Sequence, residues 1–292
     1  MGVIVGEGRE HWIKAEDGLA LFVREYVPRP PQTGLPVLCL HGLTRNSRDF
    51  ERVGPRIAAL GRRVLALDVR GRGHSDRDGD PSHYAPPVYV EDALHVLDAL
   101  EVEEAIWIGT SMGGIMTMIA AAQAPDRIAA AVLNDVGPQL DPAGLVRIGG
   151  YVGHGEVFAD WGQAEAAVAA QQAQAFPKAT PAFFAEFARR TCRERPDGRV
   201  EFDYDPAIAL PFRQPGGAAP LDMTALFDAL HEVPLLVTRG ALSDLLSRAG
   251  LDFMRARRPD LEWAEVPDIG HAPNLEEPAA WDALLDFLAR AP

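Results

Sequence analysis

The feature that most constrains the fold of this chain is a regular alternation of short apolar runs with longer helical patterns. The apolar runs are rich in Val, Leu, Ile and Ala, as buried strands are. They lie at 37–40, 63–68, 105–109, 130–135, 234–239 and 261–266. Helical patterns occur between or after several of them, at 90–100, 112–124 and 278–290. Strands that alternate with helices form βαβ units, so the sequence predicts an α/β fold with a parallel sheet and helices on both of its faces.

Two further segments extend this pattern. Two alternating runs within 11–27 flank Asp17-Gly18, a dipeptide that suits tight turns, and predict an opening β-hairpin. Between about Gly137 and His231 the alternation stops, and helical patterns follow one another with no clear strand. Structureless loops of ~90 residues are rare in compact domains, so we expect a helical layer over the carboxyl edge of the sheet. The predicted organisation is a core at 1–137 and 232–292, interrupted by an inserted unit at 138–231.

Charge and cysteine content restrict the partners that the chain can have. Its 292 residues include 28 Lys and Arg against 42 Asp and Glu, a formal net charge of −14. Such a charge repels nucleic-acid phosphates and anionic lipids, so neither nucleic acid nor a membrane is expected as a partner. The two cysteines, Cys39 and Cys192, lie far apart and indicate neither a disulfide framework nor a zinc knuckle. We expect a cytoplasmic protein, and its oligomeric state is left open.

The most informative segment joins the apolar run at 105–109 to the helical pattern at 112–124. The junction reads Gly109-Thr110-Ser111-Met112-Gly113, a GxSxG sequence in the strand-turn-helix context of a nucleophile elbow. A sharp turn needs small neighbours, which the two glycines provide. It would expose the Ser111 hydroxyl and aim the Met112 N–H at a developing oxyanion. The alternative is a plain turn in which Ser111 only caps the helix.

A serine hydroxyl needs a base to become a nucleophile, and the base needs an acid that orients it. His271 lies in a polar loop between the last predicted strand and the last predicted helix, and it is the candidate base. Asp244 follows the strand predicted at 234–239 and is the candidate acid. Asp135, which ends the strand predicted at 130–135, is the alternative acid.

The segment after the strand at 37–40 supplies a second candidate oxyanion donor. Gly42 allows the backbone to approach closely, and the Leu43 N–H is that donor. Arg45 is a candidate ligand for a substrate carboxylate, with a solvated loop arginine as the alternative. The glycines at 71 and 73 belong to no phosphate-binding motif, and no histidines pair at metal-ligand spacing. Neither a metal nor an organic cofactor is expected.

Taken together, the motifs resemble the α/β-hydrolase superfamily over nearly the whole chain. The segments that carry the resemblance lie at 38–50, 68–76, 109–114, 239–244 and 270–278. The resemblance implies a mostly parallel eight-stranded sheet flanked by helices, with a helical lid inserted after strand 6. It also implies Ser111 as nucleophile, His271 as base and Asp244 as acid, in the chain order of that superfamily. The backbone N–H groups of Leu43 and Met112 would form the oxyanion hole.

The predicted function is hydrolysis of small to medium carboxylic esters through an acyl-enzyme on Ser111. Haloalkane dehalogenases and epoxide hydrolases are similar but carry Asp at this position. A C–C bond hydrolase, a cofactor-free perhydrolase and a non-catalytic ligand-binding protein of the same fold are the alternatives. We expect the inserted unit to select the ester substrate. Its residues Trp161 and Phe184 are tentative substrate contacts, with packing of the lid against the core as the alternative.

Overall fold

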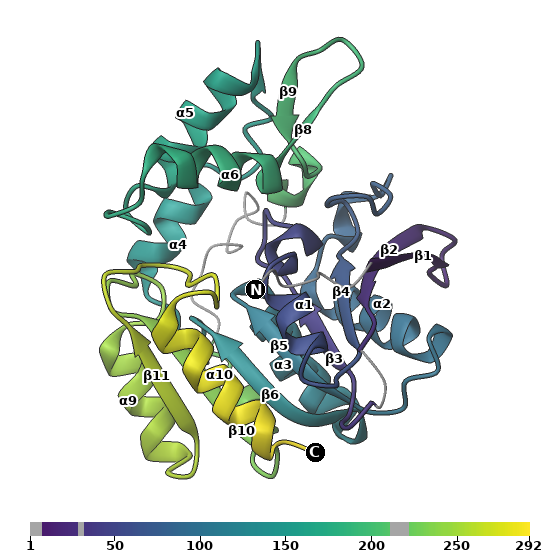
Figure 1. Cartoon of the computed structure of the whole chain (residues 1–292), viewed down its shortest axis with the longest axis vertical. Coiled ribbons are helices and arrows are strands. Elements are labelled where there is room, and N and C mark those ends of the chain that lie inside the picture. Colours follow the sequence, from purple (N-terminus) through teal and green to yellow (C-terminus); the bar gives the residue numbers. More distant parts are fainter. Residues whose placement is uncertain (1–7, 29–31, 211–221) are drawn as a thin grey trace.

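The computed structural model describes residues 8–28, 32–210 and 222–292. Its centre is an eight-stranded sheet in the order β1-β2-β4-β3-β5-β6-β10-β11 (Figure 1). The strands are β1 (Gly8–Lys14), β2 (Ala20–Tyr26), β3 (Val37–Leu40), β4 (Val64–Asp68), β5 (Ala105–Thr110), β6 (Ile128–Asn134), β10 (Leu235–Gly240) and β11 (Glu262–Val266). β2 runs antiparallel to both β1 and β4, and the other pairings in this sheet are parallel. The mostly parallel sheet is therefore confirmed, and β1 and β2 form the predicted hairpin.

Helices cover both faces of the sheet because the side chains of each buried strand alternate between two apolar layers. In β3, Leu38 and Leu40 belong to one layer, while Val37 and Cys39 belong to the other. The first layer packs against α2 (Pro86–Ala99), α3 (Met112–Gln123), α8 (Thr224–Asp228) and α9 (Arg248–Arg257). The second packs against α1 (Val53–Ala58) and α10 (Pro278–Arg290). Short 3-10 turns lie at η1 (Ser47–Phe50), η2 (Pro81–His83), η3 (Pro125–Arg127) and η4 (Pro206–Ala209).

Most of the chain between β6 and β10 forms a unit with an apolar cluster of its own. Its helices are α4 (Pro142–Gly149), α5 (Trp161–Gln172) and α6 (Pro181–Thr191). A small antiparallel sheet, β7-β9-β8, joins them through β7 (Val157–Phe158), β8 (Cys192–Glu194) and β9 (Val200–Phe202). Phe176 and Phe187 belong to its apolar cluster. Figure 1 shows α5, α6, β8 and β9 grouped beyond one end of the large sheet.

This inserted unit differs from the sequence prediction in two ways. The sequence predicts no strand there, whereas the described residues of this unit form three. Each is two or three residues long and too short to show an alternating pattern. In addition, α8 packs against the main core through Phe227 and does not join the apolar cluster of the inserted unit. Among the described helices, none combines the length and apolar character needed to cross a membrane.

Candidate active site

Ser111 lies on the sharp turn between β5 and α3, and its backbone adopts φ 53° and ψ −112°. The neighbouring glycines permit this turn. A Cβ at Gly109 would overlap the backbone of Gly113, and one at Gly113 would overlap the carbonyl oxygen of Leu40. The Ser111 side chain makes no capping hydrogen bond to α3. The strand-turn-helix prediction therefore holds in geometry, and the role of Ser111 as a simple helix cap receives no support.

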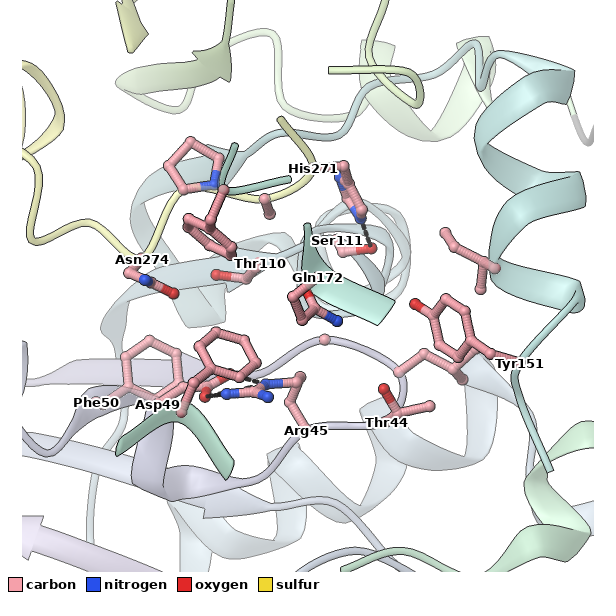
Figure 2. Close-up of a pocket in the computed structure, with 17 residues that line it drawn as sticks. Thr44, Arg45, Asp49, Phe50, Thr110, Ser111, Tyr151, Gln172, His271 and Asn274 are labelled. Atoms are coloured by element: carbon pink, nitrogen blue, oxygen red, sulfur yellow. Dashed lines mark hydrogen bonds and ion pairs between the residues drawn. The ribbon is translucent and has the colours of Figure 1, made fainter. Parts of the chain in front are cut away.

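The Ser111 hydroxyl faces His271 (Figure 2), and this contact is the first of two hydrogen bonds that His271 makes in the site. The His271 Nε2 atom lies 2.9 Å from Ser111 Oγ, and its Nδ1 atom lies 2.8 Å from Asp135 Oδ2. A carboxylate only accepts hydrogen bonds, so Nδ1–H donates to Asp135 and Nε2 is left to accept from the serine hydroxyl. Two residues far apart in sequence thus bring Ser111 a base and an oriented carboxylate.

Asp135 is held rigidly for this contact. It is fully buried and follows β6 directly, with φ at 56°. Its Oδ1 accepts the Gly240 N–H at 2.9 Å, and its Oδ2 accepts the Ser243 hydroxyl at 2.6 Å. Since β10 lies next to β6 in the sheet, these donors reach across from the neighbouring strand end. These two hydrogen bonds orient the Asp135 carboxylate so that its Oδ2 atom faces His271.

The expected contact between Asp244 and His271 is wrong. Asp244 instead forms a two-pronged ion pair with Arg147 of α4, at 2.6 and 2.8 Å, and accepts from Gln174 at 3.2 Å. Although burial opposes it, the hydrogen bonds and charge of Arg147 keep the pKa of Asp244 below its ordinary value. Asp244 lies four residues beyond β10, where the inserted unit engages it, whereas Asp135 is the first residue after the strand beside β5.

The two backbone N–H groups predicted to form an oxyanion hole belong to Leu43, which lines the same cavity as Ser111, and to Met112, the next residue in the chain. Within the described part of the chain, the N–H groups of Leu43 and Met112 donate to no protein acceptor. The Leu43 carbonyl accepts a hydrogen bond from Arg72 Nε at 3.0 Å, and this contact restrains the peptide between Leu43 and Thr44. Both N–H groups are therefore free to bind a ligand atom, and the Leu43 N–H belongs to the peptide whose carbonyl, that of Gly42, accepts a hydrogen bond from the Arg45 N–H at 3.0 Å.

His41 is a supporting residue that the sequence analysis did not single out. It is fully buried, its Nε2 accepts the Val69 N–H at 3.0 Å, and its Nδ1 lies 2.7 Å from the Gly42 carbonyl. Burial lowers the pKa of His41 to about 4, so the ring is neutral at pH 7 and can both donate and accept. In the sequence, the one feature that could have pointed to this role is the position of His41 directly after the buried strand β3.

A small cavity of about 80 Å³ opens in front of Ser111 and His271. Its walls come from the segments after β3 and β5, from the histidine loop and from the inserted unit (Figure 2). The inserted unit contributes Ile148, Tyr151, Gln172, Phe176 and Phe187. Polar and aromatic side chains thus share the space around the reacting groups.

The tentative substrate contacts divide into two groups. Arg45 lines the cavity, stacks 3.9 Å from the Phe187 ring centre and forms an ion pair with Asp49. Although burial opposes it, Arg45 holds the pKa of Asp49 below its ordinary value, so the two charges balance. Trp161 and Phe184 are not among the residues that line this cavity. Trp161 donates to Glu194 at 2.9 Å, and Phe184 packs edge-on against Phe183.

The described residues contain one group with spacing suited to a metal ion, formed by Asp17, Asp78 and His83. Arg70 Nη1 already donates to both carboxylates, at 2.7 Å each, and supplies the positive charge that they need. The group belongs to a different part of the surface from the cavity in front of Ser111. We assign it a structural role.

Comparisons with known proteins agree with the fold. A family model described as alpha/beta hydrolase fold matches residues 36–278. A 3-hydroxybutyrate-oligomer hydrolase from Cupriavidus necator is 37% identical over 250 residues, which are 83% of this chain and 84% of that protein. A 2-(acetamidomethylene)succinate hydrolase from Mesorhizobium japonicum is 29% identical over 265 residues, 86% of each chain. The crystal structure of an alpha/beta hydrolase from Novosphingobium aromaticivorans is 45% identical, with a TM-score of 0.90, and covers 98% of this chain and 99% of its own.

Proposed function

This chain belongs to the alpha/beta hydrolase fold family, and we propose that it is a serine hydrolase that cleaves carboxylic esters through an acyl-enzyme on Ser111. The observation that carries the proposal is the pair of contacts made by His271. It lies within hydrogen-bond distance of Ser111 Oγ on one side and of the buried Asp135 carboxylate on the other. That arrangement is what nucleophilic catalysis by a hydroxyl group requires.

In the first half of the proposed reaction, Ser111 Oγ attacks the ester carbonyl carbon while His271 Nε2 takes the hydroxyl proton. The carbonyl oxygen becomes an oxyanion, which accepts hydrogen bonds from the N–H groups of Leu43 and Met112. Asp135 stabilises the resulting imidazolium and keeps its ring oriented. The ester C–O bond then breaks, and His271 returns the proton to the leaving alkoxide, which departs as an alcohol.

The second half repeats these steps with water as the nucleophile. His271 removes a proton from water, and the resulting hydroxide equivalent attacks the acyl carbon. The same two N–H groups bind the second oxyanion. Collapse of this intermediate breaks the bond to Ser111 Oγ, which regains its proton from His271. The products are one carboxylic acid and one alcohol, and the protein returns to its starting state.

For the substrate class we propose short esters of hydroxy acids. The relative from Cupriavidus necator, named for hydrolysis of 3-hydroxybutyrate oligomers, resembles this chain over most of both sequences. The cavity suits such a substrate, because Tyr151, Gln172 and Asn274 offer hydrogen bonds to ester and hydroxyl oxygens beside apolar walls. The balanced Arg45–Asp49 pair favours an uncharged segment next to the scissile bond. We propose that the part of the insertion built from α4, α5, α6 and the small sheet acts as the lid that shapes this cavity.

The test compares the wild-type protein with Ser111→Ala on p-nitrophenyl butyrate and on linear dimers and trimers of 3-hydroxybutyrate. We expect a burst of p-nitrophenol equal to the protein concentration, followed by steady turnover. A serine-directed phosphonate should abolish both. It should leave its phosphonyl group on the peptide that contains Ser111, with loss of its leaving group and of the serine proton. Ser111→Ala should lose at least about 10³-fold in kcat while its thermal unfolding stays near that of the wild type. Retention of a tenth of wild-type kcat in Ser111→Ala would rule out the acyl-enzyme.

A further inference from the structure

We infer that Arg48 is a positioning residue for this reaction: it fixes the oxyanion loop, defined here as residues 42–50, to the end of α6. Through this contact the inserted unit would hold the Leu43 N–H where the oxyanion develops. The inference rests on the proposed function, because it assumes that Leu43 serves as an oxyanion donor. It gives the inserted unit a part in the chemical step in addition to its part in substrate choice.

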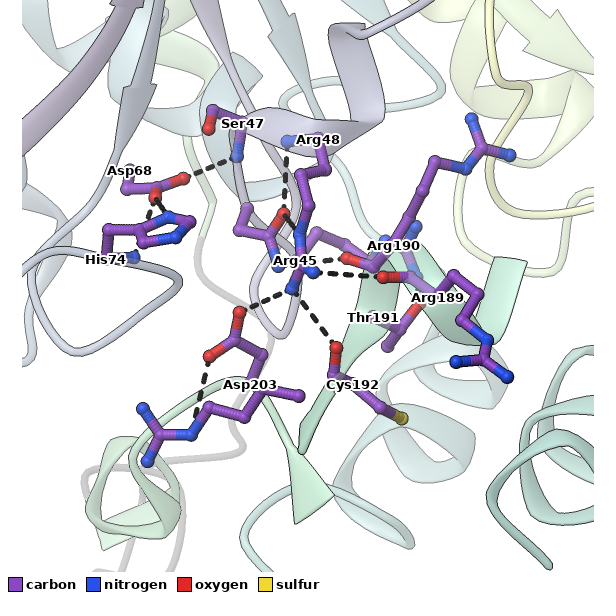
Figure 3. Close-up of polar contacts among 12 residues, drawn as sticks. Arg45, Ser47, Arg48, Asp68, His74, Arg189, Arg190, Thr191, Cys192 and Asp203 are labelled. Atoms are coloured by element: carbon purple, nitrogen blue, oxygen red, sulfur yellow. Dashed lines mark hydrogen bonds and ion pairs between the residues drawn. The ribbon is translucent and has the colours of Figure 1, made fainter. Parts of the chain in front are cut away.

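The first observation is how the C-terminal end of α6 obtains its hydrogen bonds. The last carbonyl groups of a helix have no partner within the helix. Here the oxyanion loop supplies donors. Arg48 Nη1 donates to the Arg189 carbonyl over 2.9 Å (Figure 3). Asn46 Nδ2 donates to the Arg190 carbonyl over 3.0 Å. Arg48 Nη2 also approaches the Cys192 carbonyl at 3.3 Å. A cation at this end of a helix further stabilises the helix dipole.

The second observation is an ion pair that joins the same arginine to another segment of the inserted unit. Arg48 Nη2 pairs with the carboxylate of Asp203, the residue after β9. The side chains of Arg48 and Asp203 are only 18% and 5% exposed. Loss of one member of such a buried pair removes the nearest opposite charge from the other, so the contact resists opening. Arg48 therefore joins the loop to both α6 and the small sheet.

The third observation is that the rest of the loop is anchored to the main core. The Ser47 N–H donates to Asp68 Oδ1 at 2.5 Å, and Asp68, the last residue of β4, also accepts the His74 N–H at 2.8 Å. The Asn46 side-chain oxygen accepts the N–H of Arg48 at 3.0 Å and its Nε at 3.2 Å. The loop is therefore held between the sheet and α6, and Arg48 makes several of the contacts on the α6 side.

These contacts are separable from those that dock the inserted unit elsewhere. Near the histidine loop, the Gly270 N–H donates to the Ala175 carbonyl at 2.7 Å, and Lys178 pairs with Asp268 at 2.6 Å. Neither contact involves the oxyanion loop. Replacement of Arg48 should therefore leave the inserted unit docked at the histidine side while the oxyanion loop gains freedom.

The experiment compares Arg48→Met with Arg193→Met. Arg193 approaches the same Asp203 carboxylate, at 3.7 Å, but contacts no residue of the oxyanion loop, so it is a matched control. For Arg48→Met we expect kcat on p-nitrophenyl butyrate to fall about tenfold or more, with KM within about twofold of wild type. Affinity for a trifluoromethyl ketone, which forms an oxyanion on Ser111, should fall by the same factor as kcat/KM. Affinity for the butyrate product should not change.

Hydrogen exchange of the ligand-free protein gives a readout that does not depend on activity. The backbone amides of the oxyanion loop should exchange faster in Arg48→Met than in the wild type or in Arg193→Met. Arg48→Lys keeps the charge opposite Asp203 but lacks the guanidinium fork, so its kcat should lie between those of the wild type and Arg48→Met. It also serves as the test variant if Arg48→Met does not fold.

The outcomes separate this inference from the proposed function. Unchanged loop exchange or unchanged kcat in a folded Arg48 variant overturns the positioning role. An increase in KM at constant kcat also overturns it, since Arg48 would then act on substrate binding. If the wild-type protein shows neither a burst nor turnover, the proposed function fails. In that event the exchange measurement still decides whether Arg48 restrains the loop.

Discussion

Two residues of the candidate site, Ser111 and Asp135, have backbone conformations that amino acids with a side chain rarely adopt. Their φ angles are 53° and 56°, and each directly follows a buried strand. Such conformations cost on the order of 1–3 kcal/mol each and persist only where the surrounding structure enforces them. Here β5 and β6 are neighbours in the sheet, so both strained residues project from the same edge. The strain places the hydroxyl and the carboxylate on either side of the His271 ring.

The orientation of His271 by Asp135 predicts a large difference between two Asp→Asn variants. Asp135→Asn should lower kcat by several powers of ten, because an amide favours the wrong imidazole tautomer; about 10⁴ is lost by this change in another serine hydrolase. Asp244→Asn should change kcat far less, since Asp244 pairs with Arg147. Steady-state kinetics of both variants on one ester checks the ranking. A larger loss in Asp244→Asn would mean that the acid lies after β10.

The neutral, buried His41 predicts a pH dependence of stability. Its pKa is lowered to about 4 in the folded protein by burial, against an ordinary value near 6.5. Between these values the unfolded chain binds the proton more readily, so the free energy of unfolding should decrease as the pH falls from 7 toward 4. Urea titrations at pH 7 and pH 5 measure this change for the wild type and for His41→Gln. We expect a smaller decrease in His41→Gln, and equal decreases would contradict the assignment.

At the scale of elements, the sequence predicted the parts whose signal is local. The buried strands, the hairpin around Asp17-Gly18 and the helix at 278–290 follow from apolar periodicity and turn chemistry. The elbow at Ser111 follows from the packing of a strand against a helix. The strands of the inserted unit could not be predicted in this way, because a run of two or three residues shows no alternation of apolar and polar side chains. Asp135, the partner of His271, was predicted only as the alternative acid, since nothing local to Asp244 reveals that Arg147, 97 positions away, will pair with it.

The close packing of β5, α3 and β3 at the elbow predicts opposite effects for two Gly→Ala changes. Gly113→Ala should destabilise the protein by several kcal/mol or prevent folding, because the new methyl group overlaps the Leu40 carbonyl, which cannot move without shifting the sheet. Gly149→Ala, in α4, meets no atom within 4 Å and should stabilise by about 0.5–1 kcal/mol. Chemical denaturation of the two variants measures both effects. Comparable stabilities for the pair would contradict the packing argument.

At the scale of the whole molecule, the candidate site lies between the main core, which has an apolar cluster on each face of the sheet, and the inserted unit, which has a third. The main core supplies Ser111, Asp135 and His271 from the ends of neighbouring strands, so the spacing of the reacting groups depends on the sheet. The inserted unit has its own cluster and contributes one wall of the cavity. Substitutions of the residues of that unit that line the cavity, such as Phe176, can therefore alter the cavity without removing the contacts among Ser111, His271 and Asp135. This separation is the physical basis for expecting such substitutions to change specificity more than the chemical step.

The last prediction uses this separation to test which aromatic residues select the acyl chain. Phe176 lines the cavity, whereas Phe184, from the same apolar cluster, does not. Phe176→Leu should therefore change the ratio of kcat/KM for p-nitrophenyl hexanoate to that for the butyrate by about tenfold, the scale on which a pocket discriminates one or two methylene groups. Phe184→Leu removes the same atoms away from the cavity and should leave the ratio within about twofold. Both kcat/KM values must be measured below the unfolding transition of each variant, because either change can loosen the inserted unit. Equal ratios in the two variants would show that the wall seen in front of Ser111 is not the surface against which the acyl chain is selected.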